Sequence, residues 1–147
     1  MIPLIILFIL LLDQFTKFLA TSYLTLNQPQ PVLEKFFYLT LVYNRGAAFG
    51  ILKNQLYLFI LTSVVTIVLI YLTLLDSSQR KPLNVMVGFG FILAGASGNL
   101  IDRLLFGHVI DFLDFTFWPV FNVADSAITV GAVLLGWHLL FNKKLKA

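Results

Sequence analysis

The sequence contains no cysteine and only two histidines, and just 12% of its 147 residues are charged. Without cysteine the chain can form no disulfide, no thiol nucleophile and no thiolate metal site. The histidines, His108 and His138, lie far apart, so a histidine-rich metal site is not expected either. These absences exclude a secreted disulfide scaffold, and we expect the protein to need no cofactor.

Apolar residues, in contrast, are abundant. Hydrophobic residues make up 59% of the chain, and its mean hydropathy is +0.92. Soluble domains are usually about half apolar and about a quarter charged, and a small domain has too little interior to hide so much apolar surface. Most of the chain is therefore expected to contact lipid, which excludes a disordered protein and an ordinary cytosolic enzyme.

Four apolar segments are long enough to cross a membrane, since a helix of about 20 residues spans a hydrocarbon core of about 30 Å. They are residues 2–20, 55–75, 82–101 and 122–141. We therefore predict an all-α membrane protein with four transmembrane helices, which form a single integral domain over residues 1–147.

The positions of lysine and arginine predict how these helices are oriented. Positive residues occur between the second and third segments and in the C-terminal tail, at Arg80, Lys81, Lys143, Lys144 and Lys146. Loops rich in lysine and arginine stay in the cytoplasm, so both termini are expected on the cytoplasmic side. The longer connections, residues 21–54 and 102–121, would then lie on the outer face.

The first outer connection contains a strand-like stretch. Residues 32–43 are rich in valine, phenylalanine, tyrosine and threonine, which favour strands. Pro31 and the turn formed by Asn44 to Gly46 bound the stretch. We predict a small extracytoplasmic antiparallel sheet at the membrane surface, whose aromatic side chains suit the lipid–water interface.

Several acidic residues lie within or beside the apolar segments, where an ionisable group costs a few kcal/mol or more and is a functional candidate by default. Asp13 and Lys17 are one helical turn apart, which is the spacing of an ion pair. That pair could be a structural bridge, or it could support a site on the outer side.

Polar side chains also mark the outer end of the third segment. Asn99 and Asp102 share one helical face, whereas Arg103 points elsewhere and could reach a carboxylate or a lipid phosphate. At the start of the fourth segment, Asn122 is a favoured N-cap, and Asp125 follows three residues later as in a capping box.

Capping does not explain why a second carboxylate, Asp111, lies a short distance before Asp125 and on the same face of the membrane. Two close carboxylates in a low dielectric cannot both ionise easily, so they share a proton. One carboxylate can then activate water while its protonated partner polarises a carbonyl, as in aspartic proteases. These residues are therefore candidates for catalysis.

Five motifs, in this order, resemble those of the lipoprotein signal peptidase family, also called signal peptidase II. They are DQFTK at 13–17, NRGAAFG at 44–50, GNLIDR at 98–103, VIDF at 109–112 and FNVAD at 121–125. The resemblance covers nearly the whole chain. It implies an aspartic endopeptidase of the bacterial inner membrane that removes signal peptides from diacylglyceryl-modified prolipoproteins, cutting just before the lipidated cysteine.

The resemblance also implies roles for individual residues. Asp111 and Asp125 would be catalytic, near the outer face of the membrane. Substrate-binding or supporting roles would fall to Asn44, Gly46, Asn99, Asp102, Arg103, Asn122, Asp13 and Lys17. The expected partners are prolipoproteins and membrane lipids, with no nucleic acid, and the protein is expected to be a monomer. The connection between the two aspartates looks short for the family.

Two other classes of protein stay open at this point. Intramembrane carboxylates and cations also mark the pathways of proton-coupled transporters and channels. Four helices without inverted repeats make a poor alternating-access transporter, however. A structural membrane adaptor is the other alternative, and it would not need Asp111 and Asp125 together. A transport pathway needs polar groups across the whole bilayer, whereas a protease acting at the membrane surface needs them on one side only.

The predicted orientation can be tested by labelling. A cysteine introduced at Gln79, between the second and third segments, should react with a membrane-impermeant maleimide only when the cytoplasmic side is opened. Because the natural chain has no cysteine, no background labelling is expected. Labelling of intact cells or spheroplasts from outside would reverse the assigned orientation.

Overall fold

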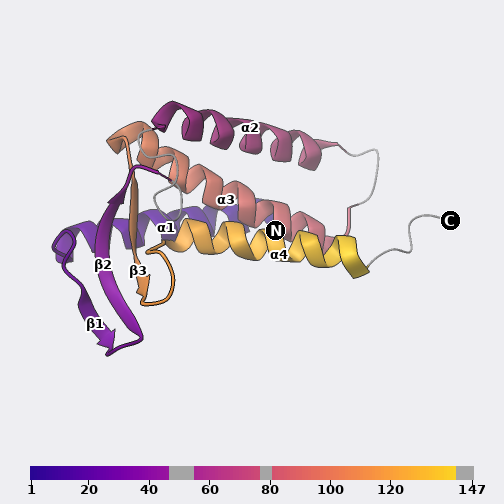
Figure 1. The fold of residues 1–147 in the computed structure, drawn as a ribbon. Coiled ribbons are helices and arrows are strands. Elements are labelled where there is room, and N and C mark those ends of the chain that lie inside the picture. The colour runs from indigo at the N-terminus through magenta and orange to yellow at the C-terminus, as the bar shows by residue number, and fades with distance from the viewer. Residues whose placement is uncertain (47–54, 77–80, 142–147) are drawn as a thin grey trace.

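The structure is a computed structural model that describes residues 1–46, 55–76 and 81–141 (Figure 1). Its helices are α1 (Ile2–Tyr23), α2 (Leu56–Leu75), α3 (Leu83–Phe106) and α4 (Val123–Phe141). All four are long and apolar enough to cross a membrane, so the four predicted spans are confirmed. Arg80, Lys143, Lys144, Lys146 and residues 47–50 of the second motif lie outside the described residues.

Helix α3 is longer than predicted. It continues to Phe106, whereas the sequence predicted an end near residue 101. Asp102 and Arg103 are therefore part of the helix and do not lie beyond its end. The helix stops at Gly107, whose φ of 73° is left-handed and whose N–H donates to the Arg103 carbonyl at 3.1 Å. Glycine adopts this terminating conformation without steric cost.

A three-stranded antiparallel sheet lies at one end of the helices, hereafter the sheet end (Figure 1). Strands β1 (Gln30–Leu33) and β2 (Phe37–Asn44) come from the stretch that the sequence predicted as a sheet. Strand β3 (Val109–Phe115) pairs with β2 and was not predicted, because it lies in the connection between the third and fourth helices. This pairing makes the segment that carries Asp111 part of a hydrogen-bonded sheet.

Helix α3 lies at the centre of the bundle and packs against α1, α2 and α4. Small residues allow these close approaches. Gly90 faces Ile2 of α1, Ala94 is fully buried, and a side chain at Gly131 of α4 would collide with the α3 backbone at Gly88. The small residues of the third segment therefore serve helix packing.

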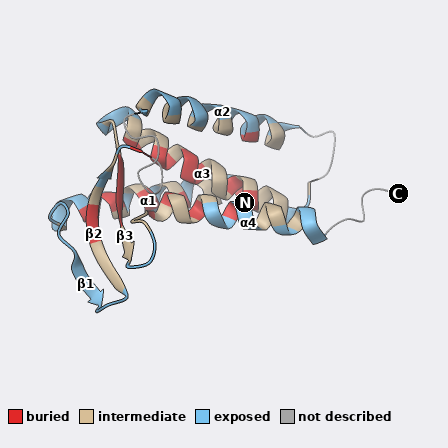
Figure 2. Cartoon of the chain, viewed as in Figure 1, coloured by how far each residue is buried: buried red, intermediate tan, exposed pale blue. Residues whose placement is uncertain are grey.

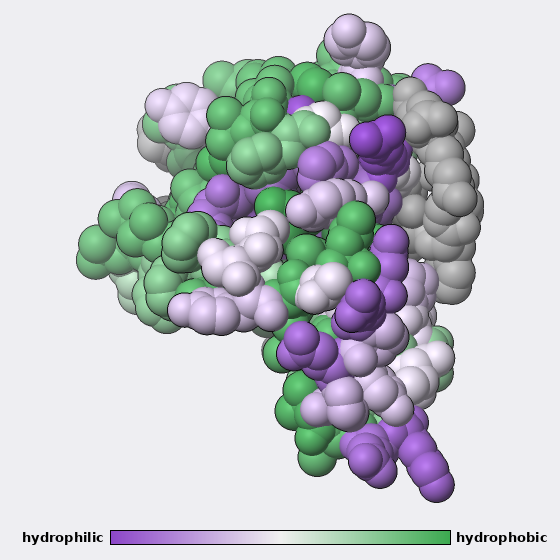
Figure 3. All heavy atoms as spheres, turned by 90° about the vertical axis from the view of Figure 1, so that its left-hand side faces the viewer, coloured by the Kyte–Doolittle hydropathy of each residue, from purple (hydrophilic) through white to green (hydrophobic). Residues whose placement is uncertain are grey.

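The burial pattern separates a lipid-facing surface from a small interior (Figure 2). In α2 only Ile70 is buried, whereas α3 carries buried residues along most of its length. Seen from the sheet end, hydrophilic residues cross the middle of the molecule and continue down the sheet, while hydrophobic residues dominate above (Figure 3). This distribution is typical of a helical bundle in lipid with its sheet at the water boundary.

Candidate active site

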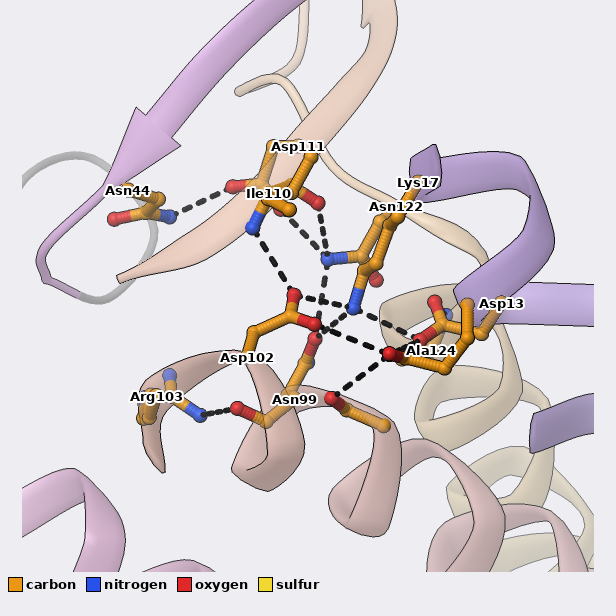
Figure 4. A network of polar contacts seen from close by, with 12 residues as sticks. Asp13, Lys17, Asn44, Asn99, Asp102, Arg103, Ile110, Asp111, Asn122 and Ala124 are labelled. Atoms are coloured by element: carbon orange, nitrogen blue, oxygen red, sulfur yellow. Dashed lines mark hydrogen bonds and ion pairs between the residues drawn. The ribbon is translucent and has the colours of Figure 1, made fainter. Parts of the chain in front are cut away.

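Four helix and strand segments bring their polar side chains together where the helices meet the sheet (Figure 4). Helices α1 and α3 supply charged and amide groups, and strand β3 and the beginning of α4 each supply an aspartate. The residues that converge here are Asp13, Lys17, Asn99, Asp102, Asp111, Asn122 and Asp125.

Lys17 forms the centre of this cluster, although only 2% of its surface is exposed. Its ammonium Nζ lies 2.9 Å from Asp13 and 2.8 Å from Asp102, and it donates to Asn99 Oδ1 at 3.0 Å. The predicted pair of Asp13 and Lys17 is therefore confirmed. Asp102 thus forms its ion pair with a lysine of another helix, α1.

The two supporting carboxylates also hold backbone amides on the segments that carry the other aspartates. Asp13 Oδ1 accepts from the Ala124 N–H at 2.8 Å, at the start of α4. Asp102 Oδ2 accepts from the Ile110 N–H at 3.1 Å, on β3. Ala124 immediately precedes Asp125 and Ile110 immediately precedes Asp111, so each supporting carboxylate fixes the backbone next to one candidate catalytic residue.

Gln14 and Gly98 complete this support, and neither was identified as a site residue from the sequence. Gln14 Nε2 donates to Asp13 Oδ2 and to Asp102 Oδ1, at 3.1 Å each. Gly98 lies where a Cβ atom would overlap Asp13 Oδ2, so any side chain there would displace the carboxylate. Both do fall within quoted motifs, Gln14 in the first and Gly98 in the third. Their roles were not predicted, because they depend on contacts between α1 and α3.

Two asparagine amides orient the candidate catalytic aspartates. Asn99 Oδ1 faces the Lys17 ammonium, so its Nδ2 donates to Asp125 at 2.7 Å. Asn122 Oδ1 accepts from the Asp125 N–H at 2.8 Å, and its Nδ2 donates to Asp111 at 2.7 Å. An ammonium and a backbone N–H can only donate, so both amide orientations are determined by their partners. The contact with the Asp125 N–H also confirms Asn122 as an N-cap.

Asp111 is almost completely buried, with 1% of its surface exposed. Besides the bond from Asn122, its Oδ2 accepts from Asn44 Nδ2 at 2.9 Å, and Asn44 in turn accepts from the Gly46 N–H at 2.9 Å. Burial and the negative charge of Asp125 raise the pKa of Asp111 to about 7, although these amide donors oppose the rise. Near neutral pH, Asp111 can therefore hold a proton that an ordinary aspartate would release.

Both aspartates line a cavity of about 460 Å³, which α2, α3, α4 and the β3–α4 loop enclose. Arg103 reaches this cavity, where its guanidinium lies 5.1 Å from the ring centre of Phe59 on α2. The α2 wall, with Phe59 and Thr62, was not predicted, because nothing in that uniformly apolar segment marks the face that borders a site. Asp114 lies outside the cavity lining and instead accepts from Thr40 Oγ1 at 2.6 Å.

The comparisons with known proteins agree in pointing to one family. The model of the family described as "Signal peptidase (SPase) II" matches residues 5–141. The chain is 51% identical over 141 residues to a lipoprotein signal peptidase of Caldanaerobacter subterraneus subsp. tengcongensis, covering 93% of this chain and 94% of the relative. It is 43% identical over 145 residues to a lipoprotein signal peptidase of Halothermothrix orenii, covering 99% of both chains.

Two solved structures are also similar to this chain in fold and sequence. A bacterial membrane enzyme structure superposes with a TM-score of 0.89 at 33% sequence identity, covering 99% of this chain and 93% of that one. A second bacterial membrane enzyme structure superposes with a TM-score of 0.86 at 32% identity, covering 97% of this chain and 94% of that one.

The buried position of Lys17 leads to a prediction about stability. In Lys17→Met, Asp13 and Asp102 would lose their shared cation, and breaking a buried ion pair in this way costs about 3–5 kcal/mol. We expect a clear fall in the thermal unfolding midpoint in detergent micelles. Lys35→Met is the matched control, because Lys35 lies on the exposed β1–β2 turn. Equal midpoints for the two variants would show that the cluster does not stabilise the fold.

Proposed function

This chain belongs to the signal peptidase II family, and we propose that it cleaves signal peptides from prolipoproteins with Asp111 and Asp125 as an aspartic catalytic pair. One observation carries the assignment of the pair. Both carboxylates line the same cavity, and each accepts a hydrogen bond from an asparagine amide whose orientation its other partners determine. Family membership makes the protein a peptidase, and its four spans make it a multi-pass protein of the bacterial inner membrane.

In the proposed reaction, Asp111 begins protonated and Asp125 begins ionised. Asp125 lies in the first turn of α4, where the helix dipole favours a negative charge. It accepts a proton from water while the water oxygen bonds to the scissile carbonyl carbon, and the Asp111 proton stabilises the carbonyl oxygen. When the C–N bond breaks, a proton passes to the leaving nitrogen, which becomes the new amino terminus.

We assign the remaining site residues to binding and support. Arg103 and Asn44 line the cavity beside the aspartates and are suited to hydrogen-bond the peptide backbone of the substrate. Gly46 holds the Asn44 side chain through its N–H. Asp13 and Lys17 support the site from α1, as described above, and act on the reaction only through the groups that they position.

The expected substrate is a signal peptide whose cleavage site precedes a cysteine that carries diacylglycerol. A signal peptide is itself an apolar helix, so a site open to the bilayer can receive it. We further propose that residues 1–147 act as one domain and as a monomer in contact with membrane lipids. Both termini would be cytoplasmic, and the site would face the periplasm.

A proton-coupled transporter or channel is not favoured. The comparisons identify relatives named as peptidases, and the buried charges gather at the sheet end of the bundle. Helix α2 contributes no charged residue at all. A pathway through the bilayer would need polar groups along its full depth.

Substitution of either aspartate tests the catalytic assignment. Asp111→Asn and Asp125→Asn should each lower the cleavage rate by orders of magnitude while the protein still inserts, because a carboxamide cannot exchange the proton and the pair acts as a unit. The measurement is mass spectrometry of products from a diacylglyceryl-modified prolipoprotein. Asp114→Asn is the control and should have a mild effect, since Asp114 lies outside the cavity lining. Wild-type turnover in either of the first two variants would refute the pair.

The pH profile and the response to chelators test the chemistry. With Asp111 as the acid and a pKa of about 7, kcat/KM should fall as the pH rises through about 7, because Asp111 then loses its proton. It should also fall in acid as Asp125 becomes protonated, which gives a bell-shaped curve. EDTA should leave the rate unchanged, because the described residues contain no group of three histidine or acidic side chains arranged to hold a metal. Inactivation by EDTA that zinc reverses would contradict this mechanism.

A further inference from the structure

A second cavity borders the first at the sheet end of α4. It has a volume of about 430 Å³ and lies beneath the β3–α4 loop, against Phe117, Trp118, Phe121, Ser126 and Val130. We propose that this cavity is a subsite for an acyl chain of the lipid on the substrate cysteine. The proposal rests on the proposed function, and it adds where the lipid lies while the peptide is cut.

The second cavity adjoins the catalytic one. Asp125, Trp118, Phe121 and Thr129 line both cavities. A group attached to the residue next to the scissile bond therefore begins beside the second cavity. The lipidated cysteine is the residue just after the cut, so its acyl chains begin at this boundary.

The walls of the two cavities differ in chemistry. The first contains Asn44, Asn99 and Arg103, which can bind a peptide backbone. In the second, both hydroxyl groups are used within α4: Ser126 Oγ donates to the Asn122 carbonyl at 3.0 Å, and Thr129 Oγ1 donates to the Asp125 carbonyl at 2.9 Å. Apart from Asp125, the wall therefore offers methyl groups and aromatic rings, which favour hydrocarbon.

Aromatic rings form the roof of this cavity and connect it to the sheet. The ring of Phe115 lies 6.0 Å from that of Phe117 and stacks on that of Phe121 at 5.9 Å, while Phe36 lies 5.9 Å from Phe117. Phe117 is 71% exposed. The catalytic mechanism gives these rings no role, but an acyl chain entering beneath the loop would pass along them.

Another apolar cavity, of about 630 Å³, lies between α1 and α4. It is larger and shares Ser126 and Val130 with the second cavity, but its lining includes neither catalytic aspartate. A chain attached at the scissile bond would therefore meet the second cavity first. The connection to Asp125 therefore decides between the two apolar cavities and favours the one beneath the loop.

A pair of substitutions on α4 tests the subsite. Val130→Trp would narrow the second cavity and also the larger one between α1 and α4, which Val130 lines as well. Val133→Trp places the same ring on an exposed valine that lines none of the three cavities. Trp118 lines the second cavity and not the larger one, so the fluorescence test below distinguishes these two cavities. Each variant would be assayed on one prolipoprotein peptide that carries diacylglycerol with either hexadecanoyl or butanoyl chains. The preference is the ratio of kcat/KM for the long-chain substrate to that for the short-chain substrate.

We expect the wild type to prefer long chains. In Val130→Trp this ratio should be roughly tenfold lower than in the wild type, mostly because KM for the long-chain substrate rises. Excluding about two methylene groups from an apolar site has an effect of this size. Val133→Trp should keep the wild-type ratio. The subsite is wrong if the wild type shows no chain-length preference or if both variants keep it. If the wild type cleaves neither substrate, the proposed function itself fails.

Fluorescence provides a second test that does not depend on the folding of Val130→Trp. The chain has two tryptophans, so Trp137→Phe leaves Trp118 as the only reporter, and Asp111→Asn prevents turnover. A substrate brominated on its acyl chain should quench Trp118 more strongly than one brominated at the start of its signal peptide. Equal quenching by the two substrates, or equal quenching by a brominated lipid that is not attached to peptide, would overturn the proposal.

Discussion

The rest of the site depends on one buried cation between two buried carboxylates. Lys17 pairs with both Asp13 and Asp102, and none of the three side chains is more than 2% exposed. Charges cost too much in a low dielectric unless their partners are held in good geometry. Helices α1 and α3 must therefore meet at this point, and the carboxylates then anchor the beginning of α4 and strand β3 through their backbone amides.

This arrangement also affects the charge state of the proposed catalytic pair. Among the described residues, Asp13, Asp102, Asp111 and Asp125 lie close to two cations, Lys17 and Arg103. With every group ionised, the cluster would carry two excess negative charges away from bulk water. A proton kept by Asp111 removes one of them, which agrees with its raised pKa. Lys17 is thus paired with Asp13 and Asp102. The proposed catalytic pair would therefore share a proton.

The division between polar and apolar walls follows from the positions of the helices. Helix α3 carries Asn99 and Arg103 into the first cavity, while α2 covers it with an uncharged face. On the other side of the β3–α4 loop, the wall consists of aromatic rings and the surface of α4. The proposed substrate is partly peptide and partly lipid, and it would need both kinds of wall beside one pair of aspartates. The loop between Asp111 and Asp125 lies between the two walls.

The sequence alone determined the four spans, since span length and hydropathy are local properties of the chain. It also identified both candidate catalytic aspartates and the pair of Asp13 with Lys17, which lies within one helical turn. Only the tertiary structure decided that Lys17 also holds Asp102, that β3 joins the sheet, and that Asp13 reaches the Ala124 amide. These contacts join residues on different elements, up to 111 positions apart. They arise when helices pack and strands pair, and no local pattern of residues specifies which distant atoms then meet.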